Sequence, residues 1–431
     1  MRPSASSVPA IRHRLQAFGD GLKRRQDVVR GIQWGVVALY AFLLVAPVAA
    51  PNGVLSGLAR FSEALFWGVW WPGVILATLL FGQFWCGLLC PDGTLTEFAS
   101  RCGRGGKIPP WLRRAGWPLL GFAWLTVCEQ LTAAHHSPRA TLLLLGGASL
   151  LALLTGLLVG RGKRVWCRYL CPLSAVFSLL SRYAVLHFRV DRAVWDAAPR
   201  QPGNSVDCPL LLDVRRLRSN EKCSMCGRCS GHRGAVRLAL RAPGSEIAAL
   251  AGGEGDPRRW EALAIVFGLV GLCYGALHWR GSVWHAALLA LPAPGGVSAA
   301  WAVGAALLAI LLPAAVIGGS LSLALLAVGG TQERAVRLAY GLIPLAGVGL
   351  LLGSLEYSLA ILEREGVRVA QLLPALRALI LAPALFWSAR LGWLQLRADV
   401  PGRLLPGAAL AIHSATLILL AACYQFAPSA L

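Results

Sequence analysis

The amino-acid sequence predicts an all-α polytopic membrane protein with about nine transmembrane helices and one small polar insert. Hydrophobic residues make up 56% of the 431 residues, charged residues make up 14%, and the mean hydropathy is +0.60. This composition is typical of an integral membrane protein. Two further observations shape the prediction, namely the spacing of the apolar segments and a cysteine motif that occurs twice.

The apolar segments give the expected helices in order. A helix that crosses a bilayer needs about 20 mostly apolar residues. Nine segments roughly meet this length, at residues 32–50, 64–85, 116–134, 141–160, 261–279, 300–328, 338–355, 372–390 and 404–425. The sixth is overlong and contains Pro313, so a kink or a split at this point would change the count by one.

The formal net charge of +21 sets the orientation of these helices. The basic residues lie in short loops between apolar segments and do not form one polar domain, so we expect no nucleic-acid partner. The positive-inside rule places residues 1–31 in the cytoplasm, as a basic tail without a signal peptide. It places four loops on the same side, at residues 101–114, 161–168, 331–337 and 390–403.

Within residues 32–186, two repeated hairpins each end in a C-x3-C-P motif. The stretches are "FWCGLLCPDGTLTEFAS", with Cys86 and Cys90, and "VWCRYLCPLSAVFSLLS", with Cys167 and Cys171. Positions i and i+4 share one side of a helix, and the following proline can begin the next helix. We therefore expect four thiolates to converge at the cytoplasmic face and form a metal site.

The polar insert, residues 187–258, contains "DCPLLLDVRRLRSNEKCSMCGRCSGHRGAV". Cys223, Cys226 and Cys229 have the C-x2-C-x2-C spacing of bacterial ferredoxins, in which a remote Cys-Pro supplies the fourth ligand. Cys208 precedes a proline and could be that ligand. The spacing predicts a [4Fe-4S] site, while His232 leaves a Cys3His zinc site open.

These motifs resemble the membrane-bound polyferredoxin family, which includes iron-sulfur proteins attached to periplasmic nitrate and nitrous-oxide reduction. The matching pieces are "CGLLCPDGTLTE", "CRYLCPLSA" and "CSMCGRCSGHRGAV", over roughly residues 64–245. The phrases "HFRVD" and "CGRCSGHRGAV" are most similar to the polyferredoxin encoded with bacterial iron permeases for ferrous-iron uptake. The sequence departs from the family's C-x2-C-x2-C-x3-C-P pattern after Cys229, so a two-cluster domain of the soluble ferredoxin type is not expected.

The resemblance implies a small ferredoxin-like 4Fe-4S cytoplasmic insert in a protein of the bacterial inner membrane. We expect two [4Fe-4S] clusters, one on Cys208, Cys223, Cys226 and Cys229 and one on Cys86, Cys90, Cys167 and Cys171. The protein would then be an electron-transfer subunit and not a stand-alone catalyst.

Three kinds of partner follow from this interpretation. The insert carries basic residues that favour an acidic cytoplasmic electron carrier or, equally, anionic membrane lipid. They are Arg215, Arg216, Arg218, Lys222, Arg228, Arg233, Arg237 and Arg241. The third partner is a membrane or periplasmic redox protein, which the resemblance extends to an iron-permease complex.

The C-terminal transmembrane bundle, residues 259–431, matches no motif. A possible outer-side site is predicted from ionisable residues at similar depth, namely Glu129, His135, His136, His278 and Glu356. They could form a quinone pocket, a periplasmic metal site or a docking surface, or they could simply reach interfacial water. A quinone or a haem thus stays open as an additional cofactor, the haem through His413.

Two other functions use the same cysteines. Soft thiolates followed by proline could bind copper(I), as in a transition-metal transporter or metallochaperone. A structural zinc protein of the membrane is the second alternative. Acid-labile sulfide separates both from the iron-sulfur interpretation.

Overall fold

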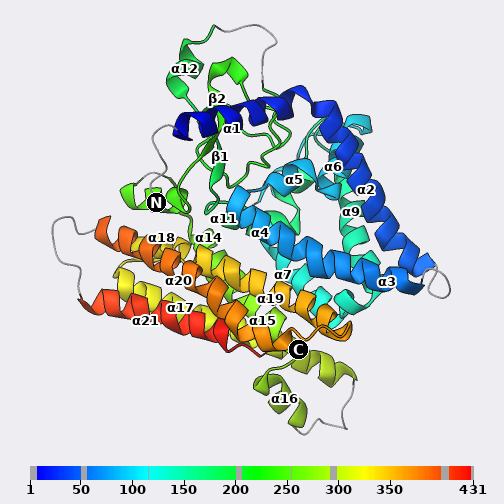
Figure 1. Ribbon diagram of the computed structural model, residues 1–431, viewed down its shortest axis with the longest axis vertical. Coiled ribbons are helices and arrows are strands. Elements are labelled where there is room, and N and C mark those ends of the chain that lie inside the picture. The colour runs from blue at the N-terminus through cyan, green and yellow to red at the C-terminus, as the bar shows by residue number, and fades with distance from the viewer. Residues whose placement is uncertain are drawn as a thin grey trace. The chain divides into compact units, whose positions relative to one another are not determined.

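The computed structural model describes residues 7–49, 56–114, 116–199, 206–253, 255–291, 299–398 and 407–428 (Figure 1). The chain forms two compact units. Unit 1 comprises Met1–Ala49, Ala77–Gly121 and Leu142–Pro243, and unit 2 comprises Ala50–Leu76, Phe122–Thr141 and Gly244–Leu431. The predicted hairpins within residues 32–186 therefore contribute to both units.

Eight helices in the described residues are long and apolar enough to cross a membrane. They are Gln26–Ala49, Gly57–Phe81, Pro138–Leu158, Arg259–His278, Ala299–Gly329, Ile343–Arg364, Ala370–Ala398 and Gly407–Gln425. The predicted span 116–134 is not among them, because helix α7 (Gly116–Leu131) has only 16 residues. Several predicted ends, at residue 50, residues 399–403 and residues 404–406, lie outside the described residues.

Helix α17 (Ala299–Gly329) runs through the overlong sixth segment as one 31-residue helix. The split considered at Pro313 therefore does not occur. Proline is tolerated inside a membrane helix because neighbouring groups can satisfy the backbone carbonyl that it frees.

Unit 1 contains the helices that carry or follow the cysteines of the two C-x3-C-P motifs. Its helices include α1 (Ser7–Arg24), α2 (Gln26–Ala49), α5 (Phe84–Leu88), α6 (Pro91–Cys102), α9 (Gly147–Leu158), α10 (Val165–Tyr169), α11 (Pro172–Leu180) and α12 (Arg192–Ala197). Helices α6 and α9 approach closely at glycines. A Cβ on Gly156 would come within 2.4 Å of the carbonyl oxygen of Thr96, so a larger residue would push the two helices apart.

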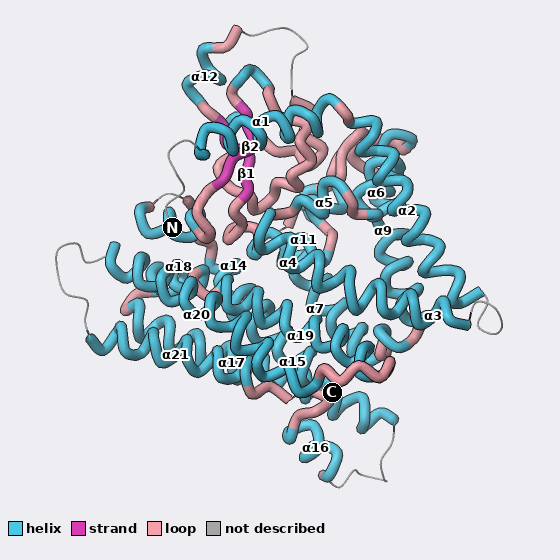
Figure 2. Tube along the Cα trace, in the orientation of Figure 1, coloured by secondary structure: helices cyan, strands magenta, loops and turns pink. Residues whose placement is uncertain are grey.

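A two-stranded antiparallel sheet closes the polar insert, which is therefore not purely helical. Strand β1 (Leu186–Val190) pairs with β2 (Val236–Leu240), and Leu186 lies opposite Leu240. Helix α1 packs against β2, and the pair of strands lies beside it in Figure 2. At Gly19 of α1 a Cβ would come within 2.9 Å of Ser230 Oγ. The N-terminal stretch predicted as a tail thus forms a helix that covers the insert.

Unit 2 is a helical bundle. Its helices include α3 (Ser56–Glu63), α8 (Pro138–Thr141), α13 (Ser245–Ala249), α14 (Arg259–Leu263), α15 (Cys273–His278), α16 (Val283–Ala290), α17, α18 (Gln332–Tyr340), α19 (Ile343–Arg364), α20 (Leu373–Ala398) and α21 (Gly407–Gln425), while α4 (Trp71–Phe81) and α7 have residues in both units. Small residues let these helices pack, as membrane helices commonly do. A Cβ on Gly275 would stand 2.1 Å from the carbonyl oxygen of Ile310 in α17. Residues 244–258, predicted as the end of the insert, group with this unit.

Candidate iron-sulfur centres

The first C-x3-C-P motif forms a tight turn between two helices. Cys86 lies in α5, and Cys90 occupies the N-cap position of α6, which begins at Pro91. The carbonyl oxygen of Trp85 accepts from the amides of Leu89, at 2.9 Å, and Cys90, at 3.0 Å. The proline starts the second helix because its fixed φ suits this position and its missing N–H costs nothing there.

The second motif repeats this turn bond for bond. The carbonyl oxygen of Trp166 accepts from the amides of Leu170, at 2.9 Å, and Cys171, at 2.8 Å, and Pro172 opens α11. The expectation of two cysteines on one helical face needs correction. In both copies the first helix ends before the second cysteine, which instead caps the next helix.

The four cysteines of these two motifs gather in unit 1, and we call them the helix-anchored set. Burial raises the pKa of the Cys86 thiol well above its ordinary value, and the nearby Cys90 and Cys167 raise it further. Burial likewise raises the pKa of Cys171, and Cys90 and Cys86 add to that shift. Because the pKa values of Cys86, Cys167 and Cys171 are each raised by a thiol of the other copy, the repeat places all four cysteines around one region.

The other four predicted ligands, Cys208, Cys223, Cys226 and Cys229, form the loop set between β1 and β2. Their backbone follows tight turns that need left-handed residues, at Met225 with φ 56° and at Gly227 with φ 77°. A Cβ on Gly227 would come within 2.6 Å of the side chain of Leu22 in α1. Glycine is therefore required here both by its backbone angle and by the close approach of α1.

The thiols of the loop set also lie near one another, in an apolar core. Burial raises the pKa of Cys229 well above its ordinary value, and Cys223, Cys226 and Cys208 each raise it further. Cys223 belongs to a core cluster with Phe188, Val214, Met225, Val236 and Leu238. The prediction that Cys208 joins the C-x2-C-x2-C run thus agrees with where the chain places it, although its role as a ligand stays a prediction.

The two sets adjoin each other. A Cβ on Gly87, next to Cys86, would stand 2.0 Å from the carbonyl oxygen of Ser224 and 2.9 Å from the amide of Cys226. The amide of Arg164 donates to the carbonyl oxygen of Pro209 at 2.8 Å. The backbones that carry the two sets are therefore in direct contact.

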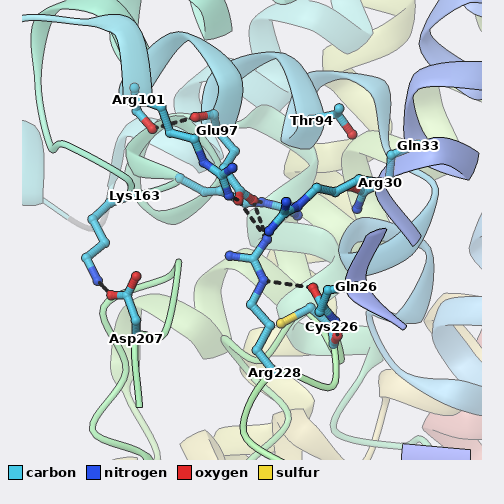
Figure 3. Close-up of polar contacts among 12 residues, drawn as sticks. Gln26, Arg30, Gln33, Thr94, Glu97, Arg101, Lys163, Asp207, Cys226 and Arg228 are labelled. Carbon is cyan, nitrogen blue, oxygen red and sulfur yellow. Dashed lines mark hydrogen bonds and ion pairs between the residues drawn. The ribbon is translucent and has the colours of Figure 1, made fainter. Parts of the chain in front are cut away.

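A buried carboxylate, Glu97 of α6, ties this region together. It accepts from Arg164 Nε at 2.8 Å, from Arg228 Nη2 at 2.6 and 2.8 Å, and from Arg101 Nη2 at 2.5 Å. Figure 3 shows Arg228 reaching toward Glu97 and also toward Gln26 of α2. Burial by itself would raise the pKa of Glu97, but Arg164 and Arg228 outweigh burial and lower the pKa to about 2. This residue was not singled out from the sequence, because its partners lie far along the chain.

Unpaired donors fit a sulfur-rich group beside the helix-anchored set. Arg164 Nη2, Trp166 Nε1 and Arg168 Nη1 are buried without a hydrogen-bond partner, and they flank Cys167 in the sequence. Buried donors normally find an acceptor, and the sulfurs of an iron-sulfur cluster accept hydrogen bonds. Among the described residues, no three His, Cys, Asp or Glu side chains are arranged to hold one metal ion. This finding is compatible with a [4Fe-4S] cluster, because its four thiolates bind different iron atoms and do not converge on a single ion. A set of four thiols therefore fits a cluster of this type.

Two of the eight predicted surface cations turn inward. Arg228 binds the buried Glu97, and the guanidinium of Arg241 donates to the carbonyl oxygens of Ala184 and Ser181, at 2.9 and 3.2 Å. Arg215 is exposed but pairs with Asp196 at 2.8 Å. The positive surface expected for an acidic carrier is therefore smaller than the sequence alone suggests.

The predicted outer-side residues lie in unit 2, where four of the five line one cavity of about 90 Å³. These four are His135, His136, His278 and Glu356, whereas Glu129 is not part of the lining. The wall also contains Glu63, Trp67, Gln130, Trp279, Arg280, Tyr357 and Arg364. Segments from α3, the end of α7, α15 and α19 meet here, which no sequence motif indicated.

Hydrogen bonds fix most polar groups of this cavity, but one histidine nitrogen is free. Gln130 Nε2 donates to Tyr357 Oη at 3.0 Å and its Oε1 accepts from Trp279 Nε1 at 3.1 Å. His135 is only 4% exposed, and its Nδ1 has no partner. Burial, with a smaller contribution from the nearby His136, lowers the pKa of His135 to about 3. At neutral pH this side chain is uncharged, with one nitrogen available to a ligand.

The candidate haem ligand His413 does not face an open site. Its Nε2 packs against α20, where a Cβ on Gly392 would stand 2.0 Å from it. This nitrogen has no hydrogen-bond partner, but α20 covers it and leaves no room for the iron that an axial ligand must reach. The structure therefore does not favour a haem on His413.

Comparison with known proteins agrees with the cysteine chemistry. A family described as a 4Fe-4S binding domain matches residues 63–115 and 142–192. Each matched region contains one C-x3-C-P motif, whereas the loop set lies outside both. The chain is thus a mostly helical membrane protein with 4Fe-4S binding domain regions, and the iron-sulfur prediction is confirmed at this level.

Three curated proteins are distant relatives. They are Protein NirI of Paracoccus denitrificans (strain Pd 1222), 26% identical over 260 residues, 50% of this chain and 36% of that protein; Regulatory protein NosR of Pseudomonas aeruginosa PAO1, 26% over 248 residues, 49% and 34%; and Putative electron transport protein YccM of Escherichia coli K12, 25% over 222 residues, 42% and 54%.

The chain spans only 34% to 54% of the lengths of these relatives. No solved structure matches it. The expected resemblance to membrane polyferredoxin-type proteins is confirmed as distant homology. None of the three names concerns iron uptake, so that finer expectation has no support here.

Proposed function

We propose that this protein is a membrane-bound electron-transfer subunit with two [4Fe-4S] clusters, passing single electrons between a cytoplasmic carrier and a membrane or periplasmic redox partner. The observation that carries the proposal is the pair of largely buried four-thiol sets, with only Cys223 fully buried, whose backbones touch at Gly87 and Cys226. The name of YccM, a putative electron transport protein, supports the same class of function.

The chain's own residues have distinct tasks in this proposal. The helix-anchored set would hold one cluster at the ends of preformed helices, and the loop set would hold the other in the apolar core under α1. A bound [4Fe-4S] cluster supplies a centre that takes up and releases one electron. Close contact between the two sets keeps the path between centres short, and burial keeps water away from the thiolates.

The alternatives of a copper carrier and a structural zinc protein make different predictions for purified material. We expect about eight iron atoms and about eight acid-labile sulfides per chain, from two clusters of the four-cysteine type. Iron and sulfide are measured on anaerobically purified protein, with EPR after dithionite reduction. About one zinc or copper without labile sulfide would refute the proposal.

The cavity of unit 2 is our candidate for the membrane-side partner, which we propose to be a quinone ring. Its aromatic walls suit a planar ring, and the free His135 Nδ1 suits a carbonyl oxygen. Two candidate membrane helices end at the cavity, at His278 and Arg364, and a third begins at Gly57, six residues before the lining residue Glu63. A lipid-soluble ligand would reach it from the bilayer.

Binding of decylubiquinone to the purified protein tests this extension. His135→Phe keeps an aromatic ring but removes the nitrogen, and we expect binding to weaken about tenfold, the usual effect of losing one hydrogen bond. His285→Phe, outside the cavity lining, is the control. Equal affinity for the wild type and His135→Phe would exclude this site.

A further inference from the structure

Arg164 stands at a special position of the internal repeat. It lies three residues before Cys167, and the equivalent residue of the first copy, three residues before Cys86, is Gln83. Each residue forms the N-cap of the short helix that carries its cysteine. The two copies therefore place a cation and a neutral amide at matching positions.

The side chain of Arg164 is only 1% exposed and is held from several directions. Its Nε donates to Glu97 at 2.8 Å, and its Nη1 donates to the carbonyl oxygen of Cys86 at 3.1 Å. Its backbone amide donates to Pro209, next to Cys208. The guanidinium of Arg164 is thus held against the first motif, while the backbone of Arg164 is held against the loop set.

The charge of Arg164 acts on thiols of both sets, and more strongly on the helix-anchored set. Although burial lowers the pKa of Arg164, Glu97 raises it, and Cys167 and then Cys226 raise it further. Burial raises the pKa of Cys90, and Arg164 is among the groups that oppose this rise. Its Nη2 is left as a buried donor without an acceptor.

Gln83 behaves differently. Its Nε2 donates to the carbonyl oxygens of Glu221, at 2.7 Å, and Asn220, at 3.3 Å. It ties the first motif to the insert without adding a charge. A neutral glutamine can therefore occupy this N-cap position. The turn does not require the positive charge that Arg164 brings to the second copy.

On the basis of the proposed function, we propose that Arg164 is a positioning residue that raises the reduction potential of the cluster on the helix-anchored set above that on the loop set. Glu97 holds the guanidinium in place and partly cancels its charge. Reduction adds negative charge to a cluster, and a buried cation with a free N–H donor stabilises that charge. The two centres then differ in potential because the buried guanidinium of Arg164 lies beside the helix-anchored set.

Redox titration of the full chain, followed by EPR at stepped potentials, tests the proposal. Arg164→Gln copies the residue of the first repeat and should lower the equilibrium constant for reduction of the helix-anchored cluster at least tenfold, or about 59 mV for one electron. Glu97→Gln should shift the same potential upward, because the cations lose their counter-charge. Arg101→Gln, which removes a 46% exposed partner of the same carboxylate, is the control and should change it least.

Iron and sulfide content are measured first on every variant. Absence of clusters from the wild type would refute the proposed function and this inference with it. Clusters that are present in Arg164→Gln with an unchanged potential would overturn the inference alone.

If Arg164→Gln loses its cluster, Arg164→Lys decides, because it keeps the cation without the planar fork. A lysine variant with a cluster near the wild-type potential supports the electrostatic role. Loss of the cluster in both Arg164 variants would show that Arg164 only holds the fold, and would overturn the inference.

Discussion

The helix-anchored set and the loop set each contain four thiols, but the backbone that carries them differs. In the first, each pair of cysteines lies at a junction of two helices, and the turn is closed by the carbonyl of Trp85 or Trp166. In the second, the cysteines lie on coil that depends on left-handed residues such as Met225. The helix-anchored set is therefore formed largely by local helix geometry, whereas the loop set depends on long-range packing under α1.

Replacement of single cysteines is the strongest way to break this comparison. Cys171→Ser should remove the cluster of the helix-anchored set and Cys226→Ser that of the loop set, each halving iron and sulfide to about four per chain. The hairpins form without metal, so protein levels in the membrane should fall only modestly, unlike small metal-dependent domains. Metal analysis, EPR and immunoblots of membranes check this. If either change removed both EPR signals, the two sets would be one assembly.

Removal of the metal should affect the two scaffolds unequally. After anaerobic chelation we expect residues 206–235 to gain hydrogen exchange by more than tenfold, because a coil site loses its cross-links with the metal. The turns at Cys90 and Cys171 should change less, since their backbone bonds are intrahelical or close the turn. Hydrogen exchange with mass spectrometry measures both in one sample. Equal loss of protection would refute the difference between the scaffolds.

Gly87→Ala tests the contact between the sets. The new Cβ would stand 2.0 Å from the carbonyl oxygen of Ser224, so the loop must move. We expect unfolding free energy to fall by about 1–3 kcal/mol and magnetic coupling between the reduced centres to weaken. Gly21→Ala in α1 is the matched control, because nothing lies within 4 Å of its Cβ. Unchanged coupling in Gly87→Ala would mean that this contact does not set the spacing of the centres.

The smallest effect concerns pH. The folded pKa of Glu97 is lowered to about 2, below its ordinary value of 4.5, by Arg164 and Arg228 against the opposing effect of burial. Its contribution to stability is therefore complete above about pH 4.5 and is lost as the pH falls toward 2. Between pH 7 and 8, above the pKa of about 6 to which burial raises the carboxyl of Asp92 beside Cys90, the potential shift of Arg164→Gln should stay constant. A shift that changed with pH in this range would mean that another group titrates beside Arg164.

The sequence alone predicts the membrane segments, the repeated C-x3-C-P turns and the C-x2-C-x2-C loop. These features depend on local patterns, because apolar length predicts a spanning helix and proline fixes the start of the next helix. It overestimated helix α7, whose apolar residues extend beyond the 16 that are helical. Eight of the nine predicted spans overlap candidate membrane helices in the described residues, because apolar length is a local property of the sequence.

Which polar groups meet depends on the packing of segments that are far apart in the sequence. Arg164 and Glu97 are 67 positions apart, and Arg228 and Glu97 are 131 apart, so no window of sequence shows that one buried carboxylate binds both. The same holds for the cavity in unit 2, where His135, His278 and Glu356 come from separate helices. Helix packing fixes such contacts. A buried charge without a partner costs free energy, so the fold is stable only when the packing places an opposite charge beside it.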